Sequence, residues 1–296
     1  MNPDQANVST ADVLSEAARI AGIDCHGAEL IRDGSHVIYR LGDIVARIGQ
    51  RGSDFAARRE LRISRWLNEC GIATVESVAG LKQPVIVAER PVTWWRLIPE
   101  HRPSTPGELG AMLHDLHQLT APADLALPDY EPFAGLYERL ATADEVGRAD
   151  RQWLLQHYTE LRTRHDDLPT PAHLGVIHGD AWQGNLVVPT SGIPTVLDLD
   201  KVSLGRREWD LIQLAVDYTD FRRITAQDYR AFVDAYGGYD VTAWPGFRLL
   251  ADVQELRWAA FAVERSRTSP QAAAQAAHRI ACLRGQVARP WRWDAL

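Results

Sequence analysis

Side chains able to handle a phosphate group are concentrated in one short segment, between residues 176 and 200. An apolar run leads into His178-Gly179-Asp180, and Asn185 follows Asp180 by five positions. A second apolar run ends at Asp198. Because the two runs flank a turn rich in glycine and proline, they are expected to pair as a hairpin. This pairing predicts that Asn185 faces Asp198, with Asp180 close by on its loop.

Two carboxylates and an amide oxygen that converge in this way suit a hard cation. Mg²⁺ usually takes one or two carboxylates together with phosphate oxygens and water. Asp180 is not needed as a metal ligand. It can accept a hydrogen bond from a hydroxyl group and direct that hydroxyl at a phosphorus atom.

The spacing resembles a known family. His178-x-Asp180-x-x-x-x-Asn185 followed by Asp198 resembles the catalytic loop and the metal-binding aspartate of the kinase-like fold. The His-Gly-Asp form, with Asp198-Leu199-Asp200 after it, resembles the aminoglycoside phosphotransferase family of small-molecule kinases. The resemblance implies that Asp180 is the catalytic base and that Asn185 and Asp198 are Mg²⁺ ligands.

A segment downstream extends the resemblance. Gly205-Arg-Arg-Glu-Trp-Asp210-Leu211 resembles the family segment whose aspartate supports the catalytic loop. The resemblance implies that role for Asp210. It also implies that His178 supports the loop and is not the base.

The N-terminal third resembles the nucleotide-binding part of the same fold. There, a glycine-containing hairpin covers the nucleotide phosphates, and Asp33-Gly34-Ser35-His36 occupies that position. Gly34 and Ser35 are therefore nucleotide-binding candidates. The family places a basic residue on the third strand, here Arg47 and not lysine, and pairs it with a helix glutamate, here Glu60.

The elements that must position these residues can be read from hydrophobic periodicity and turn residues. Thr10 is expected to cap a helix that Gly22 ends, and Thr105-Pro-Gly-Glu108 is a capping box that opens another helix. After residue 105 the chain is predicted to be helical, except for the extended segment 176–199. The other expected elements are strands at 28–32, 36–41 and 44–48, a helix at 54–68, and extended segments at 74–78 and 85–97, the last interrupted at Pro91.

This order predicts an α+β, two-lobed protein-kinase-like fold. Residues 1–100 would form a nucleotide-binding lobe built on an antiparallel sheet, with the first helix attached. Residues 101–296 would form a mainly helical lobe with the catalytic loop and the acceptor pocket. The joint is expected near residues 97–105.

The acceptor residues are the least determined part. Trp182, inside the catalytic loop, can pack on a sugar face, hold a cation or simply support the loop. Asp217 and Glu255 are candidates for binding a cationic acceptor. Glu255 lies off the apolar stripe of its predicted helix, so it is expected to line a pocket or face water.

Composition narrows the partners. The chain has 296 residues, 46% of them hydrophobic, and a formal net charge of −7. An acidic chain without a basic face is a poor match for nucleic acid. We find no apolar run near the twenty residues of a membrane helix and no signal peptide, which predicts a cytoplasmic protein without a membrane partner.

The sequence thus predicts a phosphotransferase that uses ATP or GTP with Mg²⁺ and phosphorylates a hydroxyl group of a small molecule. An aminoglycoside or another antibiotic is the first candidate acceptor. The alternatives are a metabolite of the amino sugar, choline or homoserine type, or a nucleotide-binding regulator without turnover.

Overall fold

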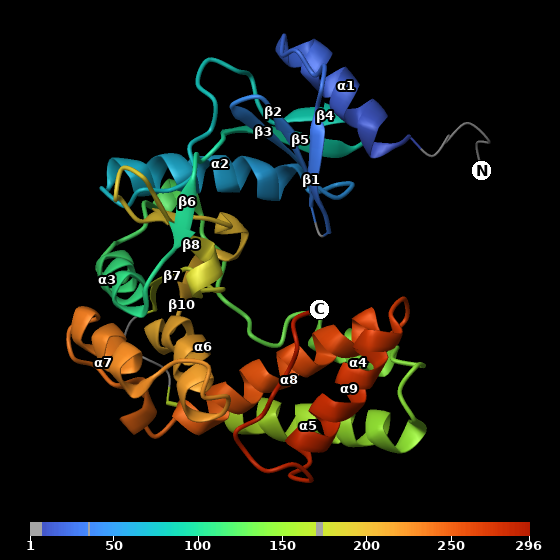
Figure 1. Cartoon of the computed structure of the whole chain (residues 1–296), viewed down its shortest axis with the longest axis vertical. Coiled ribbons are helices and arrows are strands. Elements are labelled where there is room, and N and C mark those ends of the chain that lie inside the picture. The colour runs from blue at the N-terminus through green and yellow to red at the C-terminus, as the bar shows by residue number, and fades with distance from the viewer. Residues whose placement is uncertain (1–7, 35, 170–173) are drawn as a thin grey trace. The chain divides into compact units, whose positions relative to one another are not determined.

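The computed structural model describes residues 8–34, 36–169 and 174–296, and its chain divides into two compact units. Unit 1 contains the described residues up to Ser104, together with Ala121–Ala126 and Gln183–Val202. Unit 2 contains Thr105–Thr120, the described part of Leu127–Trp182, and Ser203–Leu296. Figure 1 labels their helices and strands.

Unit 1 is built on a five-stranded antiparallel sheet with the strand order β1-β2-β3-β5-β4. Gly42-Asp43 forms the two-residue turn between β2 and β3, where Leu41 pairs with Ile44. The three strands expected at 28–32, 36–41 and 44–48 are therefore present and pair in chain order as an antiparallel meander. The strands are β1 (Glu29–Asp33), β2 (Val37–Leu41), β3 (Ile44–Ile48), β4 (Val85–Val87) and β5 (Arg90–Arg96).

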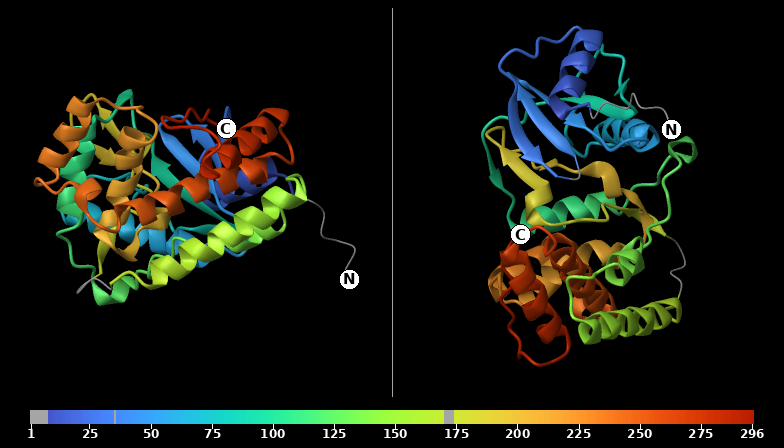
Figure 2. Two further views of the ribbon diagram at one scale, coloured as in Figure 1. Left: turned by 90° about the horizontal axis from the view of Figure 1, so that it is seen from below. Right: turned by 90° about the vertical axis from the view of Figure 1, so that its right-hand side faces the viewer.

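Helix α1 (Thr10–Ala21) covers one face of this sheet (Figure 2). Its buried Leu14 belongs to the same apolar core as Ala46, Ile48 and Trp94 of the sheet. The helix begins one residue earlier than expected, because the Ser9 hydroxyl, and not Thr10, caps it.

The turn between β4 and β5 differs from the expected break at Pro91. Ala88 and Glu89 both have positive φ, 47° and 62°, and join the strands as a two-residue hairpin loop. Pro91 lies within β5, paired with Ile86. The expected extended segment 74–78 forms no strand, only isolated bridges from Thr74 and Ser77.

The remaining elements of unit 1 surround the polar segment. Helix α2 (Asp54–Glu69) packs on β5 and on the short helix η3. A second sheet has the order β6-β8-β9. Its strands and the three short helices are β6 (His101–Pro103), β8 (Leu186–Pro189), β9 (Thr195–Val196), η1 (Ala123–Leu125), η2 (Gln183–Asn185) and η3 (Leu199–Lys201).

Unit 2 is mainly helical, with one small sheet of β7 (Gly175–Ile177) and β10 (Ser203–Gly205). Its longest buried element, α8 (Phe247–Arg265), packs against α4, α5, α6 and α9 (Figure 1, Figure 2). The expected capping box at Thr105 and Glu108 is present at the start of α3. The other helices are α3 (Pro106–Leu116), α4 (Leu136–Ala141), α5 (Arg148–Asp166), α6 (Arg207–Thr219), α7 (Ala226–Ala235), η4 (Val241–Ala243) and α9 (Pro270–Leu283).

Within the described residues, none of the helices combines the length and the apolar character that crossing a membrane requires.

Candidate active site

The candidate site in unit 1 centres on Arg47 in β3. Side chains alternate between the two faces of a strand, and Ala46 and Ile48 pack into the core that includes α1. Arg47 therefore lies on the opposite face of the sheet. Its guanidinium Nη1 forms an ion pair with Glu60 of α2, and both side chains are largely buried.

The second terminal nitrogen of Arg47 contacts two further parts of unit 1. Nη2 lies 3.2 Å from Oδ1 of Asp198 and 3.1 Å from Nδ1 of His36. Asp198 stands between β9 and η3, and His36 immediately precedes β2. Arg47 thus links four separate segments of the chain through one planar group.

The two titratable partners of Arg47 have shifted pKa values. Burial raises the pKa of Glu60 to about 7, and the nearby carboxylates of Asp200 and Asp198 add to this effect while Arg47 opposes it. Burial and the positive charge of Arg47 lower the pKa of His36 to about 4. His36 is therefore neutral at pH 7. The pKa of Glu60 lies near 7, so a further charge beside Arg47 would change how much of Glu60 is protonated.

The hairpin of β8 and β9 positions Asn185 and Asp198. Leu186 pairs with Val196, and the Leu197 N–H donates to the carbonyl of Asn185 at 2.8 Å. Asn185 and Asp198 therefore lie at the same end of the hairpin. Asp198 has a left-handed backbone with φ 54° and ψ 63°, a conformation that aspartate accepts more readily than most residues.

The oxygen donors of Asn185 and Asp198 at this end of the hairpin could supply part of the coordination of Mg²⁺. One carboxylate and one amide oxygen are typical protein ligands of Mg²⁺ when substrate phosphates and water supply the rest. The Asp198 side chain is 40% exposed, so it is accessible to such a ligand. The described chain contains no group of three or more His, Cys, Asp or Glu side chains that could hold a metal ion, so a cation here would depend on ligands from the phosphates and water.

In unit 2, Asp210 supports the backbone of the predicted catalytic loop. It lies in the first turn of α6 and is 2% exposed. Its carboxylate accepts hydrogen bonds from the His178 N–H at 2.6 Å and the Gly179 N–H at 2.8 Å. Nε2 of His117 lies 3.1 Å from the same carboxylate. Asp210 therefore fixes the two residues that precede Asp180.

The Gly179 carbonyl is held from the other side. It accepts hydrogen bonds from the Tyr130 hydroxyl at 3.1 Å and from the Trp209 indole N–H at 3.2 Å. Gly179 has φ 80°, a region in which glycine is unstrained. The next residue, Asp180, is exposed, and its N–H donates to Nδ1 of His178 at 3.3 Å. The loop backbone is thus anchored around an exposed carboxylate.

Comparison with known proteins identifies the family. Residues 28–250, well over half of the chain, match the model named APH, the phosphotransferase enzyme family. The chain belongs to the phosphotransferase enzyme family. No curated protein sequence matches it.

Solved structures of similar fold are distant in sequence from this phosphotransferase. An amicoumacin kinase with AMP-PNP, Ca²⁺ and Ami is 15% identical, with a TM-score of 0.74 over 97% of this chain and 96% of its own. A choline kinase from Streptococcus pneumoniae is 13% identical, with a TM-score of 0.66 over 94% and 100% of the two chains. A spectinomycin phosphotransferase with ADP and spectinomycin is 17% identical, with a TM-score of 0.60 over 92% and 98%. The α+β, protein-kinase-like fold predicted from the sequence is confirmed.

Two predicted nucleotide-binding residues of this phosphotransferase lie in the first hairpin. The N–H of Gly34 donates to the carbonyl of His36 at 3.2 Å, so it is used within the turn. Ser35 lies outside the described residues. The phosphate-binding roles of both residues stay predictions, as do those of Arg47 and Glu60.

The predicted acceptor-binding residues have different surroundings. Trp182 is 47% exposed, as a residue that contacts a ligand requires. Asp217 forms an ion pair with Arg223, with Oδ1 and Nη1 2.8 Å apart, and burial raises its pKa against that attraction. Its carboxylate is therefore not open to a cationic acceptor unless Arg223 moves.

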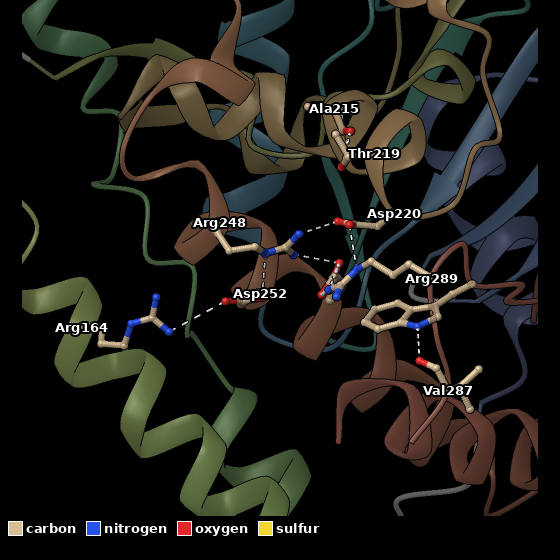
Figure 3. Close-up of polar contacts among 10 residues, drawn as sticks. Arg164, Ala215, Thr219, Asp220, Arg248, Asp252, Val287 and Arg289 are labelled. Carbon is tan, nitrogen blue, oxygen red and sulfur yellow. Dashed lines mark hydrogen bonds and ion pairs between the residues drawn. The ribbon is translucent and has the colours of Figure 1, made fainter. Parts of the chain in front are cut away.

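The expectation that Glu255 lines a pocket or faces water is wrong. Its side chain is 1% exposed because α8 is enclosed by other helices of unit 2. Arg248 lies 2.9 Å from Glu255 and 2.7 Å from Asp220, and Arg289 lies 3.2 Å and 2.7 Å from the same two carboxylates. Figure 3 shows Arg248 and Arg289 both reaching Asp220. The four side chains form a polar network in which the two carboxylates are buried and the two arginines, 39% and 40% exposed, cover them.

Three residues that contact predicted site residues within their own unit were missed from the sequence. His36 and Trp209 stood within quoted segments, but neither had a role assigned. Tyr130 belongs to no motif, because it reaches Gly179 from a loop almost fifty residues earlier in the chain. Only its position in the fold identifies it.

Proposed function

We propose that the chain is a small-molecule kinase that transfers the γ-phosphate of ATP or GTP to a hydroxyl group with the help of Mg²⁺. The observation that carries this proposal is Arg47, paired at once with Glu60 and Asp198. In kinases the strand base, the helix glutamate and the metal-binding aspartate must be in place together. A guanidinium fixed in this way suits phosphate oxygens, which it can bind in pairs.

Each residue of the site then has a distinct task. Arg47, oriented by Glu60, binds the phosphates that are not transferred. Asn185 and Asp198 hold Mg²⁺, which supplies positive charge to the terminal phosphates. Two of the similar structures contain a nucleotide together with a small molecule, AMP-PNP with Ami and ADP with spectinomycin, which supports the same pair of substrates here.

The transfer itself needs positioning more than covalent catalysis. Asp180 orients the acceptor hydroxyl and takes its proton as the hydroxyl oxygen attacks the γ-phosphorus. The new O–P bond forms while the bond from that phosphorus to the bridging oxygen breaks, and the nucleoside diphosphate leaves. Asp210 and the two donors on the Gly179 carbonyl hold the loop that carries Asp180.

We propose an antibiotic as the first candidate acceptor. The ion pairs in unit 2 indicate how much positive charge such an acceptor can carry. Asp217 and Glu255, the carboxylates predicted to receive a cation, are both paired with arginine. This favours an acceptor with few positive charges over a polycationic aminoglycoside. It also favours the second candidate function, a kinase of a small amino alcohol or amino sugar.

The test is acceptor-dependent nucleotide consumption. Purified protein is assayed with Mg²⁺ and ATP or GTP against aminoglycosides, other antibiotics, amino sugars and amino alcohols. We expect one class to give turnover and Asp180→Asn to lower kcat by about 10² to 10⁴-fold with nucleotide binding retained. Asp167→Asn, an exposed aspartate of unit 2, is the matched control. Comparable turnover by Asp180→Asn would exclude its role as base. Nucleotide binding without turnover on any acceptor would favour a regulator.

A further inference from the structure

His36 contacts Arg47, although the proposed function assigns it no task. The ring lies at the start of β2, half-buried, with Nδ1 3.1 Å from Nη2 of Arg47. The register of the sheet places the next residue, Val37, opposite Ile48, so His36 emerges from the strand beside the end of β3. The ring of His36 thus lies against the guanidinium of Arg47.

The direction of this hydrogen bond follows from the chemistry of the two groups. A guanidinium has five N–H donors and no acceptor, so Nδ1 of His36 must accept. The ring is then neutral, with its proton on Nε2. The pKa of His36, lowered to about 4 by burial and by Arg47, agrees with this protonation state.

Arg47 has three partners in the described chain, and each constrains the guanidinium differently. Glu60 binds Nη1, while Asp198 and His36 share Nη2. These contacts use three of the five N–H bonds, and the guanidinium makes no other hydrogen bond among the described residues. Two donors therefore remain for phosphate oxygens.

The neutral histidine has a particular advantage over a third carboxylate. Glu60 and Asp198 already oppose the single positive charge of Arg47. A further acidic partner would weaken the attraction between Arg47 and an anionic ligand. His36 adds a hydrogen-bond acceptor that fixes the plane of the guanidinium and adds no charge.

We propose that His36 is a positioning residue for nucleotide binding, which holds the Arg47 guanidinium in the orientation that receives the phosphates of a nucleoside triphosphate. This inference rests on the proposed function. It differs from a direct role of His36 on phosphate, because the observed contact of the ring is with Arg47. It also differs from a packing role, because the proposed effect depends on the acceptor atom Nδ1 and not on the volume of the ring.

The experiment measures binding of ATP with Mg²⁺ by titration calorimetry, without any acceptor. His36→Ala removes the acceptor atom. His36→Asn restores one, since Oδ1 of asparagine is three bonds from Cα, as is Nδ1 of histidine. Arg47→Lys removes the planar group that His36 orients. The double variant, His36→Ala with Arg47→Lys, completes a cycle.

We expect His36→Ala to weaken binding about ten-fold, the range for a hydrogen bond to a charged group, and His36→Asn to stay within about three-fold of the wild type. In the Arg47→Lys background, His36→Ala should have no further effect. Thermal unfolding of each variant establishes that it is folded.

Three results would overturn the inference. Wild-type binding by His36→Ala would show that the contact is unimportant. Equal loss in His36→Ala and His36→Asn would indicate packing by the ring. Additive losses in the double variant would show that His36 acts independently of Arg47. A wild type that binds no nucleotide would instead overturn the proposed function itself.

Discussion

Arginine at position 47 changes what the third strand can organise. A lysine ammonium is a compact charge on a flexible stem, whereas a guanidinium is a planar fork that binds several acceptors in fixed directions. Here the fork contacts Glu60, Asp198 and His36. Its orientation is therefore set by the protein before any ligand arrives, which reduces the ordering that binding must supply.

Gly179 is a second residue whose surroundings matter more than its type. Its carbonyl has two side-chain donors, and Asp180 follows it directly. We predict that Tyr130→Phe and Trp209→Phe each lower kcat about three- to ten-fold, because one hydrogen bond contributes about 1 kcal/mol. The Kd for nucleotide should not change, since neither residue belongs to the proposed phosphate site. Steady-state kinetics and calorimetry measure the two quantities.

Tyr137→Phe is the matched control for this prediction, because Tyr137 is 49% exposed in the same unit. A kcat that stays at the wild-type value in both variants would show that the Gly179 carbonyl needs neither donor. A parallel loss of nucleotide binding would indicate a general structural defect in place of loop positioning.

Individual residues could be predicted from the sequence where they belong to a motif. The motif comprises Asp180, Asn185, Asp198 and Asp210, which lie close together in the chain at a recognisable spacing. His36 contacts Arg47 in unit 1 and Tyr130 contacts Gly179 in unit 2, and a contact between segments distant in the chain leaves no pattern in one sequence. The same limit explains Glu255. Helical periodicity placed it off the apolar stripe, but it could not show that α8 is enclosed on most sides.

Among the elements, α1 stabilises the sheet that carries Arg47. Leu14 is 3% exposed and packs into the core on the face of the sheet away from Arg47. We predict that Leu14→Ala lowers the free energy of unfolding by about 2–4 kcal/mol, because it removes buried methyl groups and leaves a cavity. Urea unfolding followed by circular dichroism provides the measurement.

Ile20→Ala is the control on the same helix, since Ile20 is 52% exposed. It should change the free energy of unfolding by less than about 1 kcal/mol. Equal effects of the two substitutions would mean that α1 does not pack on the sheet as the structure shows.

The β4–β5 hairpin shows why one element boundary could not be predicted. Its two turn residues, Ala88 and Glu89, both have positive φ, a conformation that usually selects Gly, Asn or Asp. Pro91, in contrast, is a common sign of a break. The pairing of β5 with β3 and β4 determines the position of this turn, and it outweighs the local preference of alanine and glutamate for negative φ.

The Glu255 network links α6, α8 and the segment after α9, and it predicts a dependence of stability on pH. Burial and Asp220 raise the pKa of Glu255 to about 8, against the attraction of Arg248 and Arg289. Between about pH 5 and pH 8 the folded chain keeps a proton that the unfolded chain has lost. Stability from this group is therefore full at low pH and is lost as the pH rises toward 8.

We expect this group to contribute a slope of up to about −1.4 kcal/mol per pH unit to the free energy of unfolding over that range. Urea unfolding of the wild type and of Glu255→Gln at several pH values tests it. The variant stays uncharged like the protonated carboxyl, so it should differ least from the wild type near pH 5. It should become relatively more stable as the pH rises, with a slope less negative by about one proton. Parallel curves would show that Glu255 is ionised throughout.

For the whole molecule, chain order and spatial order differ. The segment Gln183–Val202 follows more than fifty described residues of unit 2, yet it belongs to unit 1, where Asp198 contacts Arg47. Sequence reasoning proposed one boundary near residue 100, because the change from strands to helices lies there. Amino-acid composition does not show that a later segment, Gln183–Val202, belongs to the first unit. The overall fold was nevertheless predictable, because its catalytic motif is highly specific.

The proposed ligands should stabilise the whole chain against unfolding. A ligand that binds only the folded state stabilises it by RT ln(1 + [L]/Kd), about 2.7 kcal/mol at a hundred times Kd. ATP with Mg²⁺ should therefore raise the Tm by about 5 °C. Chelation of the metal by EDTA should remove most of this gain, because Asn185 and Asp198 would reach the phosphates only through the cation, and without it the Asp198 carboxylate repels them. Differential scanning fluorimetry measures each condition.

Asp198→Asn separates the metal from the nucleotide in this experiment. The variant loses a charged ligand, so its Tm gain with ATP and Mg²⁺ should fall to the level that the wild type shows in EDTA. Asp43→Asn, an exposed turn residue of the same unit, should keep the full gain. If Asp198→Asn kept it as well, the cation would have to bind elsewhere, and Asp198 would serve only as a partner of Arg47. The hairpin of β8 and β9 would then organise the guanidinium and not the metal.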